Sequence, residues 1–160
     1  MKENSANIPE KGRYRRMKID EEVISENEKR RTLADHYYDN FRRYYENKNY
    51  SKASEFLCIP KLLSEFLWGS LNALAYAIGL LHGEKLSDYG KVVNFIKVLA
   101  NVYKDKEIEG CLASAQTIHA NFYHDFMDEL MFEDDRKRTE KLLEKLVKIL
   151  DAELKARLKG

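Results

Sequence analysis

Proline and glycine are scarce in this chain of 160 residues, which contains two prolines and seven glycines. An all-β protein joins many strands by tight turns that use both residue types, so the composition argues against that class. No alternation of apolar and polar residues with a period of two persists anywhere in the chain. Hydrophobic residues still make up 44% of the sequence, which is enough for the core of a single domain. The composition therefore favours an all-α fold.

Cysteines and long apolar runs are also lacking. Cys58 and Cys111 stand alone among apolar neighbours, which favours buried thiols in a reducing compartment over a disulfide framework. The N-terminus is polar and has no apolar stretch of the kind found in secretory signals. The longest apolar run, residues 66–81, is interrupted and falls short of the roughly 20 residues that a membrane span needs. We therefore expect a cytoplasmic protein that does not associate with a membrane.

Charge is unevenly distributed, although the formal net charge is only +1. Residues 1–18 hold six basic residues and two acidic ones, which predicts a flexible basic arm ahead of a helical domain at residues 19–160. Arg13, Arg15 and Arg16 are candidates for contacts with the phosphates of RNA or a nucleotide. The alternative is a solvated terminus without a ligand.

Apolar residues recur at helical spacing along the rest of the chain. Short connections between the resulting segments predict an antiparallel bundle of about five helices. Gly69, Ser70, Ala73 and Ala77 form a stripe of small residues where a neighbouring helix can approach closely. The expected helices cover residues 20–46, residues 51–81 with an interruption at Pro60, residues 87–103, residues 107–132 and residues 134–158.

Proton-transfer side chains are densest in the stretch that begins at Ile118 and ends at His124. His119 and Tyr123 are four residues apart and are therefore neighbours on a helix. His119, Tyr123 and His124 are candidate catalytic residues for proton transfer, and Asn121 is a candidate binding residue. The alternative is a buried polar network in which His119 and Asn121 bond facing helices while Phe122 and Tyr123 fill the core.

Metal binding requires more ligands than this stretch supplies. His124 and Asp128 have the i, i+4 spacing of a ligand pair, and His119 lies five residues before His124. Zinc needs four ligands, or three and a water molecule. We therefore expect neither a metal site nor a bound cofactor.

Aromatic residues alternate with arginines between Tyr37 and Tyr45. Such a run can bind single-stranded nucleic acid, because bases stack on aromatic rings along a basic groove. Helical spacing also allows Tyr37, Phe41 and Tyr45 to form part of the core, with the tyrosine hydroxyls reaching water.

Three pieces of the chain resemble motifs of the archaeal PaREP family, which is distantly related to the HEPN superfamily of helical nucleotide- and RNA-associated domains. The segments Ala53-Ser54-Glu55 and Leu67-Trp68-Gly69-Ser70 are together similar to that family's Ala-Ser-Glu-x-Leu-Trp-Gly helix. The segment Ser87-Asp88-Tyr89 resembles a second motif, in which many relatives have histidine in place of Tyr89. The segment Ile118-His119-Ala120-Asn121-Phe122-Tyr123 is similar to the family's Leu-His-x-Asn-Phe-Tyr signature.

This resemblance implies an HEPN-like bundle of four or five helices that forms a homodimer, and it implies no known activity. We interpret the chain as a binding or assembly module for RNA or a nucleotide. The alternative is a metal-independent, toxin-like ribonuclease of the HEPN type. Those enzymes carry an arginine followed, after four to six residues, by a histidine late in the bundle. Here that spacing occurs only at Arg31 and His36, on the first long helix, and no arginine lies near His119. The sequence therefore favours a binding module over an enzyme.

Overall fold

The computed structural model describes residues 21–46, 59–124 and 126–159, so the basic arm with Arg13, Arg15 and Arg16 lies outside the described residues. This part of the chain forms five helices and no strand, which confirms the predicted all-α fold. None of these helices combines the length and the apolar character that crossing a membrane would require. The helices are α1 (Glu21–Glu46), α2 (Ile59–Leu81), α3 (Tyr89–Val102), α4 (Lys106–His124) and α5 (Glu129–Leu158).

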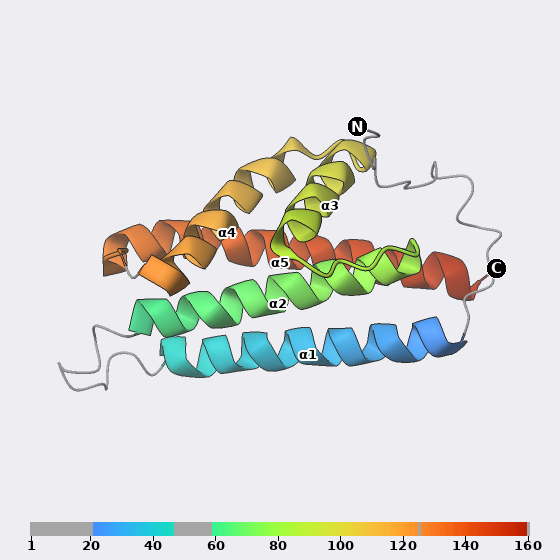
Figure 1. Ribbon diagram of the computed structural model, residues 1–160, viewed down its shortest axis with the longest axis horizontal. Coiled ribbons are helices and arrows are strands. Elements are labelled where there is room, and N and C mark those ends of the chain that lie inside the picture. The colour runs from blue at the N-terminus through green and yellow to red at the C-terminus, as the bar shows by residue number, and fades with distance from the viewer. Residues whose placement is uncertain (1–20, 47–58, 125, 160) are drawn as a thin grey trace.

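The long helices α1, α2 and α5 lie side by side, and α3 and α4 cross them diagonally (Figure 1). Chain direction alternates along α1, α2, α4 and α5, so α2 and α5 run the same way. Helix α2 contacts all four other helices, whereas α1 packs mainly against α2. Apolar or small residues cover most of the circumference of α2, which suits this central position.

The predicted stripe of small residues on α2 is the contact surface for α1. A β-carbon built at Gly69 would lie only 2.8 Å from the ring of Tyr37, so the glycine is required for this close approach. Side-chain to backbone hydrogen bonds also cross the contact, from Asn27 Nδ2 to the Ala77 carbonyl oxygen at 2.6 Å and from Ser70 Oγ to the Ala34 carbonyl oxygen at 2.9 Å. The stripe therefore fixes both the distance and the register between α1 and α2.

The boundary between the last two helices lies earlier than the sequence suggested. We expected a helix to about Phe132 and another from Asp134–Asp135, but α4 ends at His124. Asp128 is the N-cap of α5, and its side chain accepts a hydrogen bond from the Met131 backbone N–H at 2.8 Å. The predicted boundary was wrong because the acidic pair resembled a helix start, whereas the earlier Asp128 provides the cap.

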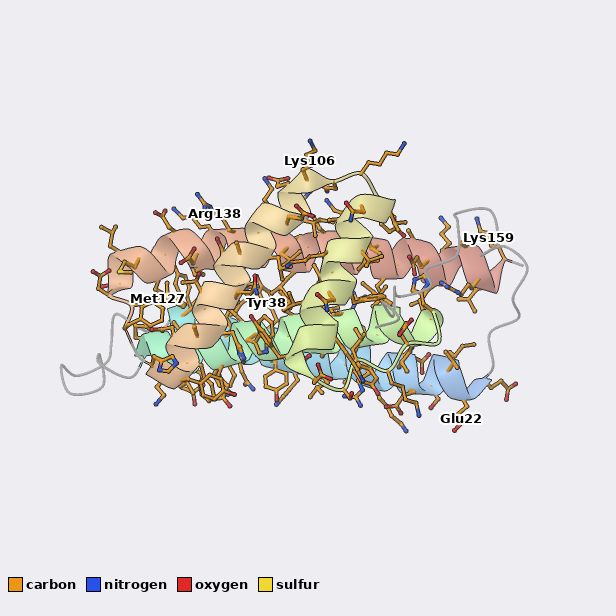
Figure 2. All side chains as sticks on the ribbon, turned by 45° about the horizontal axis from the view of Figure 1, so that its top comes forward. Glu22, Tyr38, Lys106, Met127, Arg138 and Lys159 are labelled. Carbon is orange, nitrogen blue, oxygen red and sulfur yellow. The ribbon has the colours of Figure 1, made fainter. Side chains whose placement is uncertain are left out.

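Asn121 explains why the chain breaks at this point. Its Oδ1 accepts hydrogen bonds from the backbone N–H groups of Phe126 at 2.9 Å and Met127 at 2.8 Å. Its Nδ2 lies 3.2 Å from Ser64 Oγ on α2. Met127 is buried beside the start of α5, where Figure 2 labels it. One side chain thus ties the end of α4 to α2 and holds the turn that leads into α5.

The third helix also begins one residue later than expected. Asp88 is its N-cap, and the Asp88 side chain accepts a hydrogen bond from the Lys91 backbone N–H at 2.9 Å. The hydroxyl of Ser87, which we expected to cap the helix, lies 3.0 Å from the Lys91 ammonium instead. Tyr89 therefore occupies the first position of α3.

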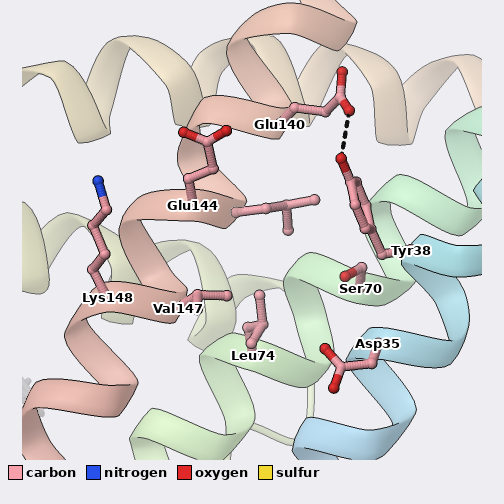
Figure 3. A pocket seen from close by; sticks show the side chains of 9 residues that line it. Asp35, Tyr38, Ser70, Leu74, Glu140, Glu144, Val147 and Lys148 are labelled. Atoms are coloured by element: carbon pink, nitrogen blue, oxygen red, sulfur yellow. Dashed lines mark hydrogen bonds between the residues drawn. The ribbon is translucent and has the colours of Figure 1, made fainter. Parts of the chain in front are cut away.

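Helices α1 and α5 face each other across a gap over α2, and long polar side chains span it. The bridges join Arg31 to Asp151 at 2.8 Å, Tyr38 to Glu140 at 2.8 Å and Tyr45 to Glu133 at 2.9 Å. Figure 3 shows the middle bridge, in which the Tyr38 hydroxyl donates to the Glu140 carboxylate. Burial and the Glu140 carboxylate raise the pKa of Tyr38 to about 12, so its hydroxyl stays neutral and donates.

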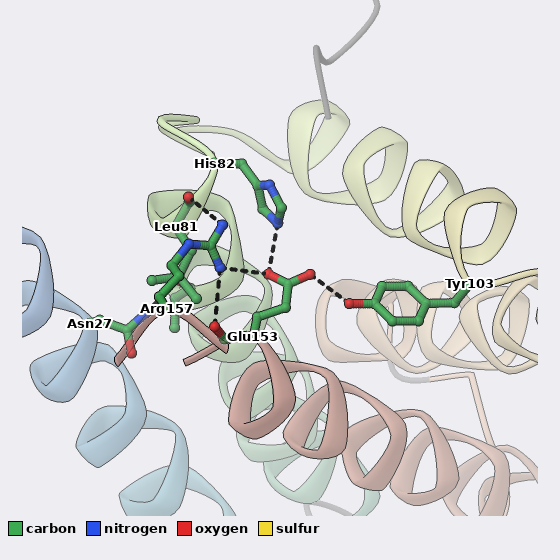
Figure 4. A network of polar contacts seen from close by, with 7 residues as sticks. Asn27, Leu81, His82, Tyr103, Glu153 and Arg157 are labelled. Carbon is green, nitrogen blue, oxygen red and sulfur yellow. Dashed lines mark hydrogen bonds and ion pairs between the residues drawn. The ribbon is translucent and has the colours of Figure 1, made fainter. Parts of the chain in front are cut away.

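A buried polar network joins the C-terminal parts of α2 and α5 to the end of α3 (Figure 4). The His82 side chain has no exposed surface, and its Nε2 lies 2.8 Å from Glu153 Oε2. Tyr103 donates its hydroxyl to the other carboxylate oxygen at 2.7 Å. Arg157 lies 3.4 Å from Glu153 Oε2 and donates to the Leu81 carbonyl oxygen at 2.7 Å. Burial by itself raises the pKa of a carboxyl, but the bonds from His82 and Tyr103 and the charge of Arg157 hold the pKa of Glu153 below its usual value.

We expect Glu153→Gln to lower the free energy of unfolding by about 3 kcal/mol at neutral pH, because it leaves the buried charge of Arg157 without its carboxylate. The lowered pKa of Glu153 also determines how the free energy of unfolding depends on pH. The stabilisation by Glu153 is complete above the usual pKa of 4.5 and is lost as the pH falls through the lower pKa of the folded state. Urea unfolding of the wild-type protein and of Glu153→Gln, at neutral and at acidic pH, measures the difference in the free energy of unfolding.

The matched control is Glu109→Gln, which removes an exposed carboxylate from α4. We expect this variant to change the free energy of unfolding by no more than about 0.5 kcal/mol. Equal effects of the two variants at neutral pH would contradict a stabilising role for the buried network.

Candidate functional site

Three helices bring four aromatic rings together at the surface of the bundle. Trp68 belongs to α2, Tyr89 begins α3, and His119 and Tyr123 lie one turn apart on α4. The ring centroid of His119 lies 4.3 Å from that of Trp68, 5.0 Å from that of Tyr89 and 5.2 Å from that of Tyr123. The rings of Trp68 and Tyr89 also contact each other, at 5.4 Å. We call these four residues the aromatic cluster.

The rings of the aromatic cluster adopt the geometries that aromatic pairs prefer. His119 stacks on Tyr89 with an interplanar angle of 16°, and Tyr123 meets His119 edge-on at 87°. Tyr89 is 43% exposed and Tyr123 is 65% exposed, whereas Trp68 and His119 are partly buried beneath them. The cluster therefore presents two tyrosine rings to solvent on a packed support.

The centre of the aromatic cluster is electrically neutral. Burial lowers the pKa of His119, so the imidazole carries no charge at neutral pH. Its Nδ1 is buried and has no hydrogen-bond partner among the described residues. Gln116 donates its side-chain amide to the Tyr89 hydroxyl at 2.9 Å, which holds one exposed ring in place. This neutral, oriented arrangement suits contact with a flat aromatic ligand.

The predicted buried polar network forms only in part. Asn121 is fully buried and bonds the facing helix α2, as that alternative required. His119 instead meets the facing helices through ring contacts with Trp68 and Tyr89. Tyr123 is largely exposed, so the expectation that it fills the core was wrong.

The pair His124 and Asp128 does not lie on one helical face. His124 is the exposed last residue of α4, whereas Asp128 caps the next helix through its side chain. Within the described residues, no three His, Cys, Asp or Glu side chains are grouped in a way that could hold a metal ion.

The aromatic and arginine run on α1 mostly serves contacts between helices. Phe41 is buried, and the hydroxyls of Tyr38 and Tyr45 bond carboxylates on α5. Arg42 pairs with Glu46 along the same helix at 3.0 Å. The run therefore offers far fewer free rings for bases than its sequence suggested.

Arg31 and His36 do not form a common site. Five residues along a helix rotate a side chain by about 140°, so the two residues point to different sides of α1. Arg31 reaches across to Asp151, and the exposed His36 has its Nε2 within 3.2 Å of Asn40 Nδ2. Among the described residues, neither His119 nor His124 has a hydrogen bond to an arginine, so no histidine of the predicted site is paired with one.

Sequence reasoning did not identify Trp68 and Tyr89 as partners of His119. A signal was nevertheless present, because each of the three stretches that carry the family resemblance contributes one of these rings. The three stretches are far apart in the sequence, and helical spacing relates residues only within one helix. Their convergence on one spot became visible only in three dimensions.

We expect Asn121→Ala to lower the free energy of unfolding by about 3 kcal/mol, because it leaves the backbone N–H groups of Phe126 and Met127 without their acceptor. Tyr123→Phe removes only the hydroxyl of an exposed ring and should change stability by less than about 0.5 kcal/mol. Urea unfolding of both variants measures the difference. A stable Asn121→Ala protein would contradict the role assigned to this side chain.

The chain was compared with protein-family models, with curated proteins and with solved structures. None of the three comparisons finds a match for it. The resemblance to the PaREP and HEPN domains therefore stays a prediction.

Proposed function

We propose that this chain is a cytoplasmic, HEPN-like binding module without catalytic activity, and that it binds RNA or a nucleotide by stacking a base on the aromatic cluster. The observation that carries the proposal is the position of His119, whose ring contacts Trp68 of α2 and the two exposed tyrosines of the cluster, Tyr89 of α3 and Tyr123 of α4. A nucleobase is a flat aromatic ligand whose face can be covered by such rings.

Stacking supplies enough free energy for weak binding that is not sequence-specific. One base stacked on an aromatic side chain contributes about 1–3 kcal/mol. Tyr89 and Tyr123 are the rings with the most exposed surface in the cluster, so they are the contact residues in this proposal. Arg13, Arg15 and Arg16 in the basic arm would add contacts to phosphates, which position a nucleic acid without reading its sequence.

The proposal does not extend to a ribonuclease of the HEPN type. A catalytic pair in such an enzyme requires an arginine close to a histidine, and Arg31 is held by Asp151 away from His36. His119 is engaged in ring contacts, and burial lowers its pKa. Stacking of a base relies on the ring contacts that hold His119 and its neighbours in place. Proton transfer by His119 does not depend on these ring contacts.

Trp68 is the only tryptophan of the chain, so its fluorescence reports on the aromatic cluster. We expect adenosine monophosphate and a short uridine oligonucleotide to quench this fluorescence in a saturable way. Tyr123→Ala and Tyr89→Ala should each raise the Kd about tenfold, because each removes a stacking surface. Tyr44→Ala, which removes an exposed tyrosine from α1, should leave the Kd unchanged.

Deletion of residues 1–18 separates the two parts of the proposal. The truncated protein should bind the oligonucleotide more weakly and with less dependence on salt, because phosphate contacts are lost. Its affinity for adenosine, which has no phosphate, should stay the same. Absence of any quenching, or equal Kd values for wild type and both tyrosine variants, would overturn the proposal.

We also propose that the module assembles as a homodimer. Phe126, Leu130 and Met131 expose large apolar side chains within six residues of the chain where α4 passes into α5, and Leu130 is 80% exposed. A second copy of the chain would bury these side chains, and two-fold pairing is the commonest form of self-association.

We expect light scattering to give about twice the chain mass of 18.8 kDa for the wild-type protein at micromolar concentration. Leu130→Lys should shift the protein to the mass of one chain, because it places a charge in the apolar contact. Lys137→Leu, a substitution of an exposed α5 residue, is the control for a change on the same helix. A wild-type mass of 18.8 kDa at all concentrations would refute the homodimer.

A further inference from the structure

The two exposed rings of the aromatic cluster stand roughly at right angles to each other. The Tyr89 ring lies 16° from parallel to the imidazole plane of His119, whereas the Tyr123 ring lies at 87° to it. Both ring centroids are within 5.2 Å of the His119 centroid, so the two tyrosines are neighbours across one imidazole. A flat base that stacks on one of these tyrosine rings therefore presents only its edge to the other.

Each of the two tyrosine rings has room for one stacked base. Tyr89 stacks on His119, which leaves the opposite face of its ring for a ligand, and the residue is 43% exposed. The contacts of Tyr123 with described rings are edge-on, with His119 at 87° and with Phe122 at 69°, and the residue is 65% exposed. The cluster thus offers two separate stacking faces, and not one slot between parallel tyrosines.

The folded bundle positions both rings before a ligand arrives. Gln116 of α4 donates its side-chain amide to the Tyr89 hydroxyl at 2.9 Å, and Trp68 of α2 contacts the Tyr89 ring. Tyr123 lies two residues after Asn121, whose bonds to α2 and to the following turn fix the end of α4. Binding therefore has less conformational entropy to lose in ordering these residues, which favours affinity.

Neighbouring bases of a single strand can cover both faces at once. Unstacked bases of single-stranded RNA splay apart, and each can then stack on an aromatic side chain of its own. Successive bases of a duplex lie parallel to one another and are paired, so they cannot cover two rings at right angles. The geometry of the two tyrosines thus favours an unpaired strand over a duplex.

We propose that the aromatic cluster binds two neighbouring, unstacked bases of one RNA strand, one on Tyr89 and the other on Tyr123. This inference rests on the proposed function, and it narrows the ligand from RNA or a nucleotide to a strand with at least two unpaired bases. Each base has its own ring, so both stacking contacts contribute to the affinity for one strand.

The test compares uridylyl-uridine with two analogues in which either the 5′ or the 3′ base is replaced by hydrogen, so that all three ligands carry the same phosphate. Binding to the full chain is followed by the fluorescence of Trp68. We expect the wild-type protein to bind the two-base ligand at least about tenfold more tightly than either one-base ligand, because one stacked base contributes a factor of this size.

Tyrosine variants show whether each ring serves one base. In Tyr89→Ala and in Tyr123→Ala, the two-base and one-base ligands should have Kd values within about twofold of each other, because a single ring remains. Tyr44→Ala, which removes an exposed tyrosine of α1, should keep the wild-type difference. Melting temperatures check that the variants are folded, and Tyr89→Leu and Tyr123→Leu replace any alanine variant that is not.

Adenosine monophosphate separates this inference from the proposed function. Its single base can use either ring, so each tyrosine variant should raise its Kd by no more than about twofold, whereas one base that touched both rings would lose about tenfold in each variant. A tenfold loss for adenosine monophosphate in both variants would keep the proposed function and overturn the two-base arrangement.

Two further results would overturn the two-base arrangement. Equal affinity of the wild-type protein for the two-base and one-base ligands would leave stacking of a single base intact but would remove the second base from the site. A tenfold difference that persisted in both tyrosine variants would place the second base outside the cluster. The absence of saturable quenching with every ligand would overturn the proposed function as well.

Discussion

The position of α4 and the start of α5 both depend on the hydrogen bonds of Asn121. The side chain is fully buried, bonds Ser64 on α2 and accepts the N–H groups that follow the end of α4. These bonds set the position of α4 relative to α2, which places His119 over Trp68. They also set where α5 starts. A buried amide with several partners is costly to move, so the elements that it joins are held together as one unit.

The second constraint is the close approach of α1 to α2. Gly69 allows the Tyr37 ring to lie only 2.8 Å from the position that a β-carbon would occupy, and this keeps α1 against α2. Helix α5 packs against α2 as well, and long polar side chains join α1 to α5. A cleft of about 360 Å³, with Leu74 of α2 in its lining, lies between them as a consequence of this arrangement. The aromatic cluster and this cleft thus both arise from how closely neighbouring helices approach α2.

Much of the fold could be predicted from the sequence because it rests on local signals. Apolar spacing identified the helices, and the small residues from Gly69 to Ala77 identified a face for close helix contact, which α1 occupies in the structure. The break between α4 and α5 could not be predicted in the same way. Asn121 ends the helix through bonds to N–H groups five and six residues later, and an asparagine in an apolar run gives no sign of such bonds. Asp128 and Asp134 are similar residues in sequence, and only the folded chain uses the first as a cap.

The sequence by itself determined the all-α fold class and the location of the densest group of proton-transfer side chains. Both follow from composition and from spacing within single helices. The tertiary structure decided what that group is. It surrounded His119 with Trp68 and Tyr89 from other helices, buried Asn121 and left Tyr123 at the surface. It also gathered Asp35 and Glu144 around one cleft from helices more than a hundred residues apart in the chain. The physical reason is that helical periodicity relates residues one or two turns apart, whereas sites between helices depend on crossing geometry and packing distance, which only the assembled core sets.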